Sequence, residues 1–330
     1  MSPIRYEIME TNIVSGQFGE IDVVQDLTTK TILVNKKSLI NYDDCLLEIL
    51  FLTYADDEKY IPKFYGYFFT CAEELVYANF IMERCQFDLF SVNKYYEKIL
   101  DKIQFISIQV ILILEYLHSK YIIHRDIKLE NLMVSDDGYL KIIDFGFATF
   151  NSGTIKEVCG TPCYMAPEML EEKYYSYSVD LWSFGMMLYE ILFDRLPFND
   201  EDEDKFNEKI LNPKLKIKVE FNPVRPELRN LLLNLLKRDP RKRIGCKQEG
   251  LEEIKRHIFF QKIVWEDYKE RRVDVSKKLD FEEIKKIIEE ESSSESSGEE
   301  SESETLSGNN SSEEDPETGL SEHDSAEDQE

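Results

Sequence analysis

This sequence of 330 residues lacks long apolar runs and contains only six cysteines. Its most apolar stretch, Val110 to Leu114, is stopped by Glu115 and is far shorter than the ~20 residues that a membrane-spanning helix needs. The six cysteines are scattered without zinc-type spacing, and no signal peptide precedes them. We therefore expect no membrane span, and an intracellular location in the cytoplasm or nucleus.

Basic clusters are also scarce, since only Arg238 to Arg243 forms one of useful size. A nucleic-acid partner is therefore not expected. The net charge is −26, but residues 289–330 hold 17 acidic residues and no Lys or Arg, and subtracting these leaves −9 for the first 288 residues. The acidic excess thus belongs to the end of the chain.

Residues 291–330 are rich in Ser and Glu and contain almost no apolar side chains. Such a segment cannot bury enough surface to offset its chain entropy, which predicts a disordered acidic tail. Several of its 12 serines have an acid three residues on, a pattern resembling sites of acidophilic kinases. A solvating tail is the favoured interpretation, and the alternative is a polyanion that competes with basic substrates.

The most informative stretch runs from Ile123 to Gly146. Residues 132–134 and 139–143 are apolar and strand-prone, and the Ser-Asp-Asp-Gly sequence between them predicts a hairpin turn. Asp126 and Asn131 precede the first strand, while Asp144 follows the second, so their oxygens can converge on one small volume. One of them can accept a proton and two can hold a hard cation. By itself, the pattern also fits a hairpin with solvated acids at its ends.

The same stretch resembles the signature of protein kinases, with His-Arg-Asp at 124–126, Asn131 and Asp-Phe-Gly at 144–146. An Ala-Pro-Glu sequence follows at 166–168, as in the kinase activation segment. The resemblance implies an α+β, two-lobed kinase fold with an N-lobe over residues 1–83 and a C-lobe over 84–270. Residues 271–290 would form a C-terminal extension before the tail.

The resemblance also implies roles for the residues of this stretch, with ATP and Mg²⁺ as cofactors and proteins as substrates. Asp126 would orient and deprotonate the acceptor hydroxyl, and Lys128, in the D-x-K pattern typical of serine/threonine kinases, would steady the transferred phosphate. Asn131 and Asp144 would hold Mg²⁺.

A glycine-containing turn near the N-terminus resembles the loop that covers the phosphates of ATP in kinases. Gly16 and Gly19 match its later glycines, whereas Val14 replaces the first. In the strand that follows, Val34 and Lys36 would share a face below this loop, and Lys36 would contact the α and β phosphates. The adjacent lysine, at position 37, would point the other way.

Two further features complete the expected nucleotide site. Glu48, in an apolar helical run, is the candidate partner of Lys36, and Asp44 is the alternative. Glu83 and Cys85 follow a predicted strand at a position that resembles the hinge between the lobes, where backbone groups bind the adenine edge.

The segment from Asp144 to Glu168 contains a sequence, Cys-Gly-Thr-Pro, that resembles the substrate-docking portion of kinases. Its Thr161 would hydrogen-bond to the catalytic loop. Glu157 stands where the AGC group, the relatives of the cAMP-dependent kinase, carries a threonine whose phosphate binds the arginine of His-Arg-Asp. We hypothesise that Glu157 pairs with Arg125 and orders the segment without phosphorylation, because a carboxylate supplies about one negative charge permanently.

Two structural contacts are expected from the same resemblance. Asp180 would cap the backbone of the catalytic loop, and Arg243 would pair with Glu168.

Substrate preference can be predicted from two acids. In basophilic AGC kinases, acids at the positions of Glu130 and Glu208 receive an arginine upstream of the target serine, and by the same resemblance Asp88 would lie near the ribose and the substrate. This predicts Arg-x-x-Ser/Thr substrates. Ordinary surface charge is the alternative for these residues.

The sequence predicts an AGC-like kinase, with a CAMK-like kinase as the second choice because the proline-rich segment and terminal F-x-x-F of many AGC members are missing. We expect a monomer. The rival function is a pseudokinase that serves as a binding scaffold.

Overall fold

The computed structural model describes residues 5–16, 19–39, 42–72, 75–93, 102–198, 200, 202–219, 224–275 and 286, without the side chains of 12, 14–16, 42–44, 92 and 93. The chain divides into two units, Met1–Phe281 and Glu282–Glu330. The predicted disorder and phosphorylation of residues 291–330 lie outside the described residues.

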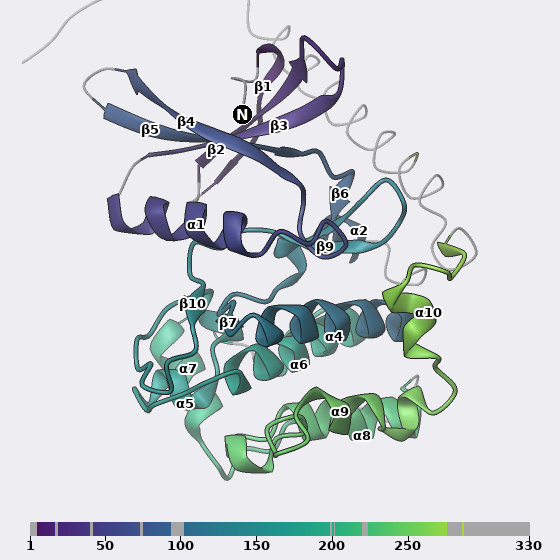
Figure 1. Ribbon diagram of the computed structural model, residues 1–330. Coiled ribbons are helices and arrows are strands. Elements are labelled where there is room, and N and C mark those ends of the chain that lie inside the picture. Colours follow the sequence, from purple (N-terminus) through teal and green to yellow (C-terminus); the bar gives the residue numbers. More distant parts are fainter. Residues whose placement is uncertain are drawn as a thin grey trace, which may run out of the picture. The chain divides into compact units, whose positions relative to one another are not determined.

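The first part of the chain folds into a five-stranded antiparallel sheet with the order β1-β2-β3-β5-β4. Its strands are β1 (Tyr6–Gly16), β2 (Gly19–Asp26), β3 (Ile32–Leu39), β4 (Phe64–Ala72) and β5 (Leu75–Glu83). Helix α1 (Tyr42–Tyr54) connects β3 to β4 and lies against one face of this sheet (Figure 1).

The alternation of β3 decides which of its side chains meet α1. Leu33 is buried with Val24 and Ile81 in a small core of the sheet. Val34 and Lys36 alternate with it and pair in register with residues 82 and 80 of β5. Because successive side chains of a strand point to opposite faces, Lys36 projects from the face opposite Leu33.

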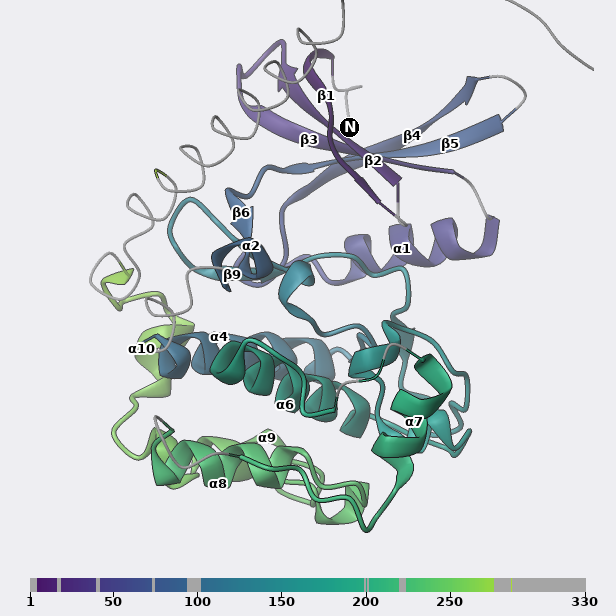
Figure 2. The same ribbon diagram turned by 180° about the vertical axis from the view of Figure 1, so that it is seen from behind.

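The second part is helical and is built around two buried helices, α4 (Ile103–Ser119) and α6 (Ser178–Phe193). They lie side by side in both ribbon views (Figures 1 and 2). Both sequences are apolar on nearly every face, as expected for helices enclosed by others. Around them lie α2 (Leu89–Asn93), α5 (Pro167–Leu170), α7 (Glu203–Leu211), α8 (Pro226–Leu235), α9 (Leu251–Lys255) and α10 (Trp265–Lys269). The 3₁₀ turns are η1 (Leu129–Asn131), η2 (Pro162–Tyr164), η3 (Pro240–Lys242) and η4 (Ile258–Phe260).

The predicted hairpin is present as β8 (Leu132–Val134) and β9 (Leu140–Ile142), joined by a turn in which Gly138 has φ +79°. Strand β6 (Phe87–Asp88) adds to β8 and makes a three-stranded sheet. Strands β7 (Ile122–Ile123) and β10 (Thr149–Phe150) pair with each other, one just before Asp126 in the chain and the other just after Asp144. Short strands therefore fix the backbone on both sides of Asp126 and Asp144.

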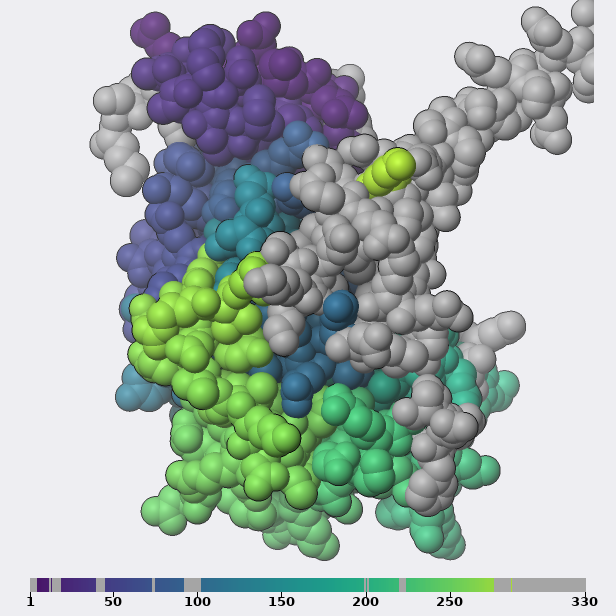
Figure 3. Space-filling view, turned by 90° about the vertical axis from the view of Figure 1, so that its right-hand side faces the viewer, coloured from purple at the N-terminus to yellow at the C-terminus, as the bar shows by residue number. Residues whose placement is uncertain are grey.

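In the space-filling view, the purple N-terminal strands occupy one end of the first unit and the green residues of α8 and α9 occupy the other (Figure 3). The predicted two-lobed α+β architecture is confirmed. Among the described residues, no helix is long and apolar enough to cross a bilayer. The six cysteines are all free thiols.

Candidate active site

Asp126 is buried at the centre of a set of hydrogen bonds in the loop before β8. The Asn131 amide nitrogen donates to the Asp126 carbonyl and to its Oδ2, each at 2.9 Å. Lys128 Nζ lies 3.0 Å from Oδ2, and the backbone N–H of Thr161 donates to Oδ1 at 2.9 Å. Both carboxylate oxygens of Asp126 are therefore held in a fixed orientation.

Lys128 also donates to the Thr161 hydroxyl at 2.7 Å. The predicted contact of Thr161 with the catalytic loop is therefore present, through Asp126 and Lys128. The chain approaches closely here, because a Cβ on Gly160 would stand 2.4 Å from the Arg125 carbonyl oxygen. Gly160 also has φ +99°, a conformation that other residues rarely adopt. Glycine is thus required where the activation segment meets the catalytic loop.

Asp180, at the start of α6, supports the catalytic loop from below, as predicted. Its Oδ2 accepts from the backbone N–H of His124 at 3.1 Å, and its Oδ1 accepts from that of Arg125 at 2.8 Å. Arg125 has φ +68°, an uncommon conformation for a residue with a side chain. The fully buried carboxylate of Asp180 holds this strained backbone in place.

Lys36 of β3 connects the sheet to the catalytic stretch. Its Nζ lies 2.6 Å from Glu48 Oε1 on α1 and 3.1 Å from Asp144 Oδ1. The predicted pairing of Lys36 with Glu48 is therefore present. Lys37 points away, with its Nζ 2.9 Å from Glu20, which agrees with the predicted alternation.

Charges around Lys36 set its protonation state and that of Asp144. Burial alone lowers the pKa of Lys36, but the carboxylates of Glu48 and Asp144 outweigh it and hold the pKa well above its ordinary value. Burial acts to raise the pKa of Asp144, but Lys36 and the Gly146 N–H lower it by more, so the net shift is downward. At neutral pH the site thus contains an ammonium group and an ionised Asp144.

The donor chemistry of Asn131 and Asp144 fits Mg²⁺. Asn131 uses its amide nitrogen toward Asp126, which leaves its carbonyl oxygen as the possible ligand. Within the described part of the chain, no cluster of three or more His, Cys, Asp or Glu residues could hold a metal by itself. A Mg²⁺ ion here would therefore take further oxygens from phosphates and water, as Mg²⁺ commonly does.

The glycine turn is only partly described. Val14 and Gly16 pair with Ile21 and Gly19, and the two residues at the tip, as well as the side chain of Val14, lie outside the described residues. At Gly19, φ is +122° and a Cβ would stand 2.2 Å from the Lys37 carbonyl oxygen. Glycine is required there so that β2 can approach β3.

The predicted hinge lies where the five-stranded sheet ends. Val34 pairs with Met82, and the backbone N–H of Glu83 donates to the Lys63 carbonyl at 2.9 Å. Since this N–H is occupied, a contact of Glu83 with adenine has to use its carbonyl oxygen. Burial raises the pKa of the Cys85 thiol to about 12, so Cys85 stays a neutral thiol at the edge of the site.

Glu157 contacts Arg125 as hypothesised, with Oε2 2.8 Å from Nη1. Sequence reasoning missed the third member, Tyr175, whose hydroxyl accepts from Arg125 Nη1 at 3.0 Å and donates to the Glu157 carbonyl at 2.7 Å. No local pattern marks this tyrosine, because it comes from the loop before α6. The Glu157 side chain remains 68% exposed, so the ion pair by itself stabilises weakly.

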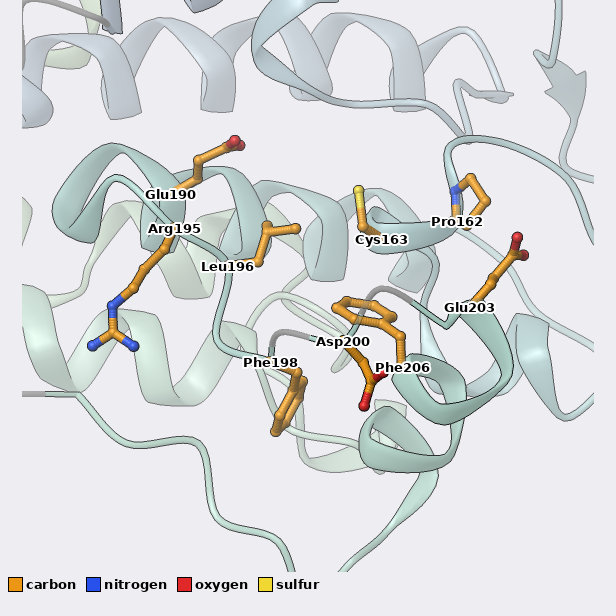
Figure 4. Close-up of a pocket in the computed structure, with 9 residues that line it drawn as sticks. All are labelled: Pro162, Cys163, Glu190, Arg195, Leu196, Phe198, Asp200, Glu203 and Phe206. Atoms are coloured by element: carbon orange, nitrogen blue, oxygen red, sulfur yellow. The ribbon is translucent and has the colours of Figure 1, made fainter.

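A pocket of about 480 Å³ opens beside the activation segment (Figure 4). Three acids and one arginine, Arg195, are in its lining, and we call it the acidic pocket. Its lining includes Glu190 of α6, Cys163 of η2 and Glu203 of α7. Burial raises the pKa of the Glu190 carboxyl, the hydrogen bond from the Tyr164 hydroxyl opposes this, and the charge of Glu130 adds to it. The charge of Glu130 thus reaches Glu190, although Glu130 itself does not line the pocket.

Sequence reasoning missed Glu190, although a lone acid within the apolar run of α6 was a usable signal. Glu208 is exposed on α7 and is not part of the pocket lining. Asp88 accepts from the backbone N–H and the hydroxyl of Ser91, at 2.7 and 2.9 Å, and so caps α2. The substrate roles of Glu208 and Asp88 remain predictions.

Glu168 and Arg243 form the predicted buried pair. Arg243 Nη1 donates to Glu168 Oε1 at 2.7 Å, and Nη2 donates to Oε2 at 2.9 Å. Arg243 also donates to the Ser178 carbonyl at 2.6 Å. The end of the activation segment is thereby fixed to the base of the helical lobe.

Comparison with known proteins places this geometry in a family. The chain matches the family model for the protein kinase domain over residues 9–260. It is 40% identical over 176 residues to RAC-beta serine/threonine-protein kinase A of Xenopus laevis, which covers 52% of this chain and 36% of the relative. It is also 42% identical over 171 residues to cAMP-dependent protein kinase type 3 of Saccharomyces cerevisiae, and this match covers 52% of this chain and 42% of the relative.

These matches span less than half the length of the curated relatives. The AGC group comprises relatives of the cAMP-dependent kinase, so this likeness agrees with the predicted group. Because the family model covers most of the chain, the chain belongs to the protein kinase family and is AGC-like within it.

Proposed function

We propose that this chain is an active serine/threonine protein kinase, which transfers the γ-phosphoryl group of ATP to a serine or threonine hydroxyl of a protein. The observation that carries the proposal is the position of Lys36, which contacts Glu48 and Asp144 at once. This contact joins the sheet, α1 and the catalytic stretch into one charged site. A scaffold without catalysis does not require this arrangement.

Each residue of the site then has one task. The Asp126 carboxylate orients the acceptor hydroxyl and takes its proton, while Lys128 neutralises charge on the transferred group. Lys36 binds the α and β phosphates, and Asn131 and Asp144 are the residues that would hold Mg²⁺. The bound Mg²⁺ supplies positive charge to the phosphate oxygens. Because the site is already oriented, catalysis consists mainly of positioning and charge stabilisation.

The deciding experiment measures phosphate transfer from ATP to an arginine-containing serine peptide, with and without Mg²⁺. We expect Mg²⁺-dependent transfer by the wild type and none by Asp144→Asn. Asp136→Asn is the matched control, because Asp136 is an exposed acid in the turn of the same hairpin. Absence of transfer by the folded wild type, despite nucleotide binding, would support the pseudokinase instead.

The proposed substrates carry a basic residue upstream of the target hydroxyl, since Glu130 and Glu190 place negative charge beside η2. A library of serine peptides should show selection for arginine. Glu190→Gln should weaken that selection, and comparison with Glu208→Gln decides which acid reads the arginine. A profile that favours acidic or proline flanks contradicts the proposal.

We further propose that Glu157 orders the activation segment without phosphorylation. Glu157→Gln should lower kcat about fivefold, because it removes the charge bound by Arg125 while Tyr175 keeps its two contacts. Glu172→Gln, another exposed acid of this region, is the control. If unmodified wild-type protein is inactive until Thr154 is phosphorylated, this idea is wrong.

A further inference from the structure

Four lysine or arginine side chains are buried in the described part of the chain, at positions 36, 125, 141 and 243. Three of them have been assigned above to the nucleotide site, the activation segment and the base of the helical lobe. The fourth, Lys141, lies in the middle of β9, three residues before Asp144, and its side chain is only 5% exposed. A buried ammonium group needs a partner, since desolvation without one is costly.

The partner of Lys141 is the hinge. Its Nζ lies 2.6 Å from Oε1 and 2.6 Å from Oε2 of Glu83, the last residue of β5. Glu83 Oε2 also accepts from the backbone N–H of Lys63 at 2.9 Å, and Glu83 N–H donates to the Lys63 carbonyl at 2.9 Å. Side chain and backbone of Glu83 are therefore both held, which fixes its rotamer and its peptide plane.

This ion pair joins the two sheets of the nucleotide site. Glu83 pairs with Leu33 in the five-stranded sheet, whereas Lys141 pairs with Met133 in the three-stranded sheet. Three residues after Glu83, the backbone N–H of Gln86 donates to the Val134 carbonyl at 2.8 Å. The hinge is thus fastened to the β8–β9 hairpin at both of its ends, and residues 84 and 85 form the span between.

The field of the pair reaches this span. Burial is the main cause that raises the pKa of the Cys85 thiol, Glu83 adds to the shift, and Lys141 opposes it. The charges of Glu83 and Lys141 therefore lie close to Cys85, whose backbone is predicted to face adenine.

We propose that Lys141 is a positioning residue for the nucleotide base: its ion pair with Glu83 holds the hinge backbone at the distance from the β8–β9 hairpin at which the adenine edge is read. The inference rests on the proposed kinase function, because it assumes that a nucleotide binds below the hinge. Lys141 itself touches no substrate. It acts through the carbonyl of Glu83 and the backbone of Cys85.

Base selectivity is the readout that separates this role from a purely structural one. Adenine has an amino group, a hydrogen-bond donor, at the position where guanine has a carbonyl oxygen, an acceptor. A rigid hinge that offers the Glu83 carbonyl oxygen to the adenine amino group therefore rejects guanine. A loosened hinge loses this preference, whereas a general loss of stability weakens both nucleotides equally.

The experiment measures Kd for ADP and for GDP by calorimetry in the full chain, with KM for ATP and kcat alongside. Lys141→Met removes the charge but keeps a long apolar stem, and it should weaken ADP binding about fivefold while GDP binding changes less than about twofold. Glu83→Gln should weaken ADP binding more, because it leaves the Lys141 charge buried without a counter-charge. The double variant should recover part of that loss.

Lys262→Met is the matched control, since it makes the same chemical change at an exposed lysine before α10. The proposal is overturned if Lys141→Met binds ADP and GDP with the affinities of the wild type. It is also overturned if the affinities for ADP and GDP fall by the same factor. If the wild type binds neither ADP nor ATP, the proposed kinase function fails and not this inference alone. If Lys141→Met melts before binding can be measured, Lys141→Arg, which keeps the charge, should retain wild-type selectivity, and a loss of selectivity there overturns the proposal as well.

Discussion

Two adjacent lysines of β3 have opposite surroundings. Lys36 is buried between two carboxylates, whereas Lys37 pairs with the partly exposed Glu20, and its Nζ lies 4.5 Å from the centre of the Tyr77 ring. Only alternation along the strand separates them, and it places one lysine in the site and the other outside. The difference can be tested with one substitution at each position.

Lys36→Met should lower kcat by about 100-fold or more, because it removes positive charge from the phosphates and leaves Glu48 and Asp144 facing each other. Lys37→Met should stay within about twofold of wild type, as expected for a partly exposed surface pair. Steady-state kinetics with a serine peptide make the comparison. A larger loss at Lys37 than at Lys36 would overturn the assignment.

Glu190 gives the acidic pocket a pH dependence. Burial raises its pKa, and Glu130 and Asp194 add to the shift, so it takes up a proton at a higher pH than a free carboxyl. Because only the ionised form attracts an arginine side chain, KM for a basic peptide should rise as the pH falls from 8 toward the raised pKa of Glu190. Glu190→Gln should raise KM at pH 8 and flatten its pH dependence.

Ionisation of Glu190 favours the binding of a basic peptide but disfavours the folded state. A carboxyl with a raised folded-state pKa binds its proton more tightly in the folded than in the unfolded chain, so its ionisation above that pKa destabilises the fold. Glu190→Gln should therefore not lower the melting temperature at pH 8. Thermal unfolding at pH 8 and pH 5 measures this effect on stability. For substrate binding, a pH profile of KM in Glu190→Gln that is the same as in the wild type would contradict the role of Glu190.

At the level of elements, the activation segment meets the catalytic loop through a close backbone contact as well as through side chains. Gly160 packs against the carbonyl oxygen of Arg125 at a distance that a Cβ cannot occupy. The adjacent Thr161 then reaches Asp126 and Lys128. One glycine thus decides whether the catalytic loop and the segment can meet.

Gly160→Ala should lower kcat by about 100-fold, since a displacement of about 1 Å at reacting groups costs that much. Gly153→Ala is the control in the same segment, because Gly153 also has positive φ but a Cβ added there would meet no atom within 4 Å. It should retain most activity. Comparable losses in both variants would show that backbone strain, and not the contact with Arg125, is responsible.

At the level of the whole first unit, the Glu168–Arg243 pair ties the activation segment to α6 and to the loop after α8. Arg243 has no exposed surface, and its guanidinium lies 5.2 Å from the Trp182 ring. Ser178 bonds to both partners, since its hydroxyl donates to Glu168 and its carbonyl accepts from Arg243. Loss of the pair should therefore affect the stability of the lobe.

Arg243→Met should lower the free energy of unfolding by about 3–5 kcal/mol, because it leaves the Glu168 carboxylate buried without a counter-charge. Urea unfolding measures this. A second substitution, Glu168→Gln, should restore part of the loss, whereas Arg241→Met, at an exposed arginine of η3, should leave unfolding unchanged within error. No recovery in the double variant would mean that Arg243 contributes through packing on Trp182.

The sequence by itself determined the family, the catalytic hairpin and the residues of the catalytic stretch. These follow from local signals: the Ser-Asp-Asp-Gly turn fixes the β8–β9 hairpin, and the alternation of β3 selects Lys36 over Lys37. Short-range sterics and burial act within a few residues, so their outcome can be predicted from the chain alone.

Only the tertiary structure decided which distant side chains meet. Tyr175 joins Glu157 and Arg125, Glu190 lines the acidic pocket instead of Glu208, and Lys141 holds the hinge through Glu83. These contacts depend on how the lobes and loops pack, and a hydrogen bond between residues far apart in sequence leaves no periodic signal in either segment. Buried charge nevertheless requires a partner, and for that reason the structure reveals the roles that the sequence left open.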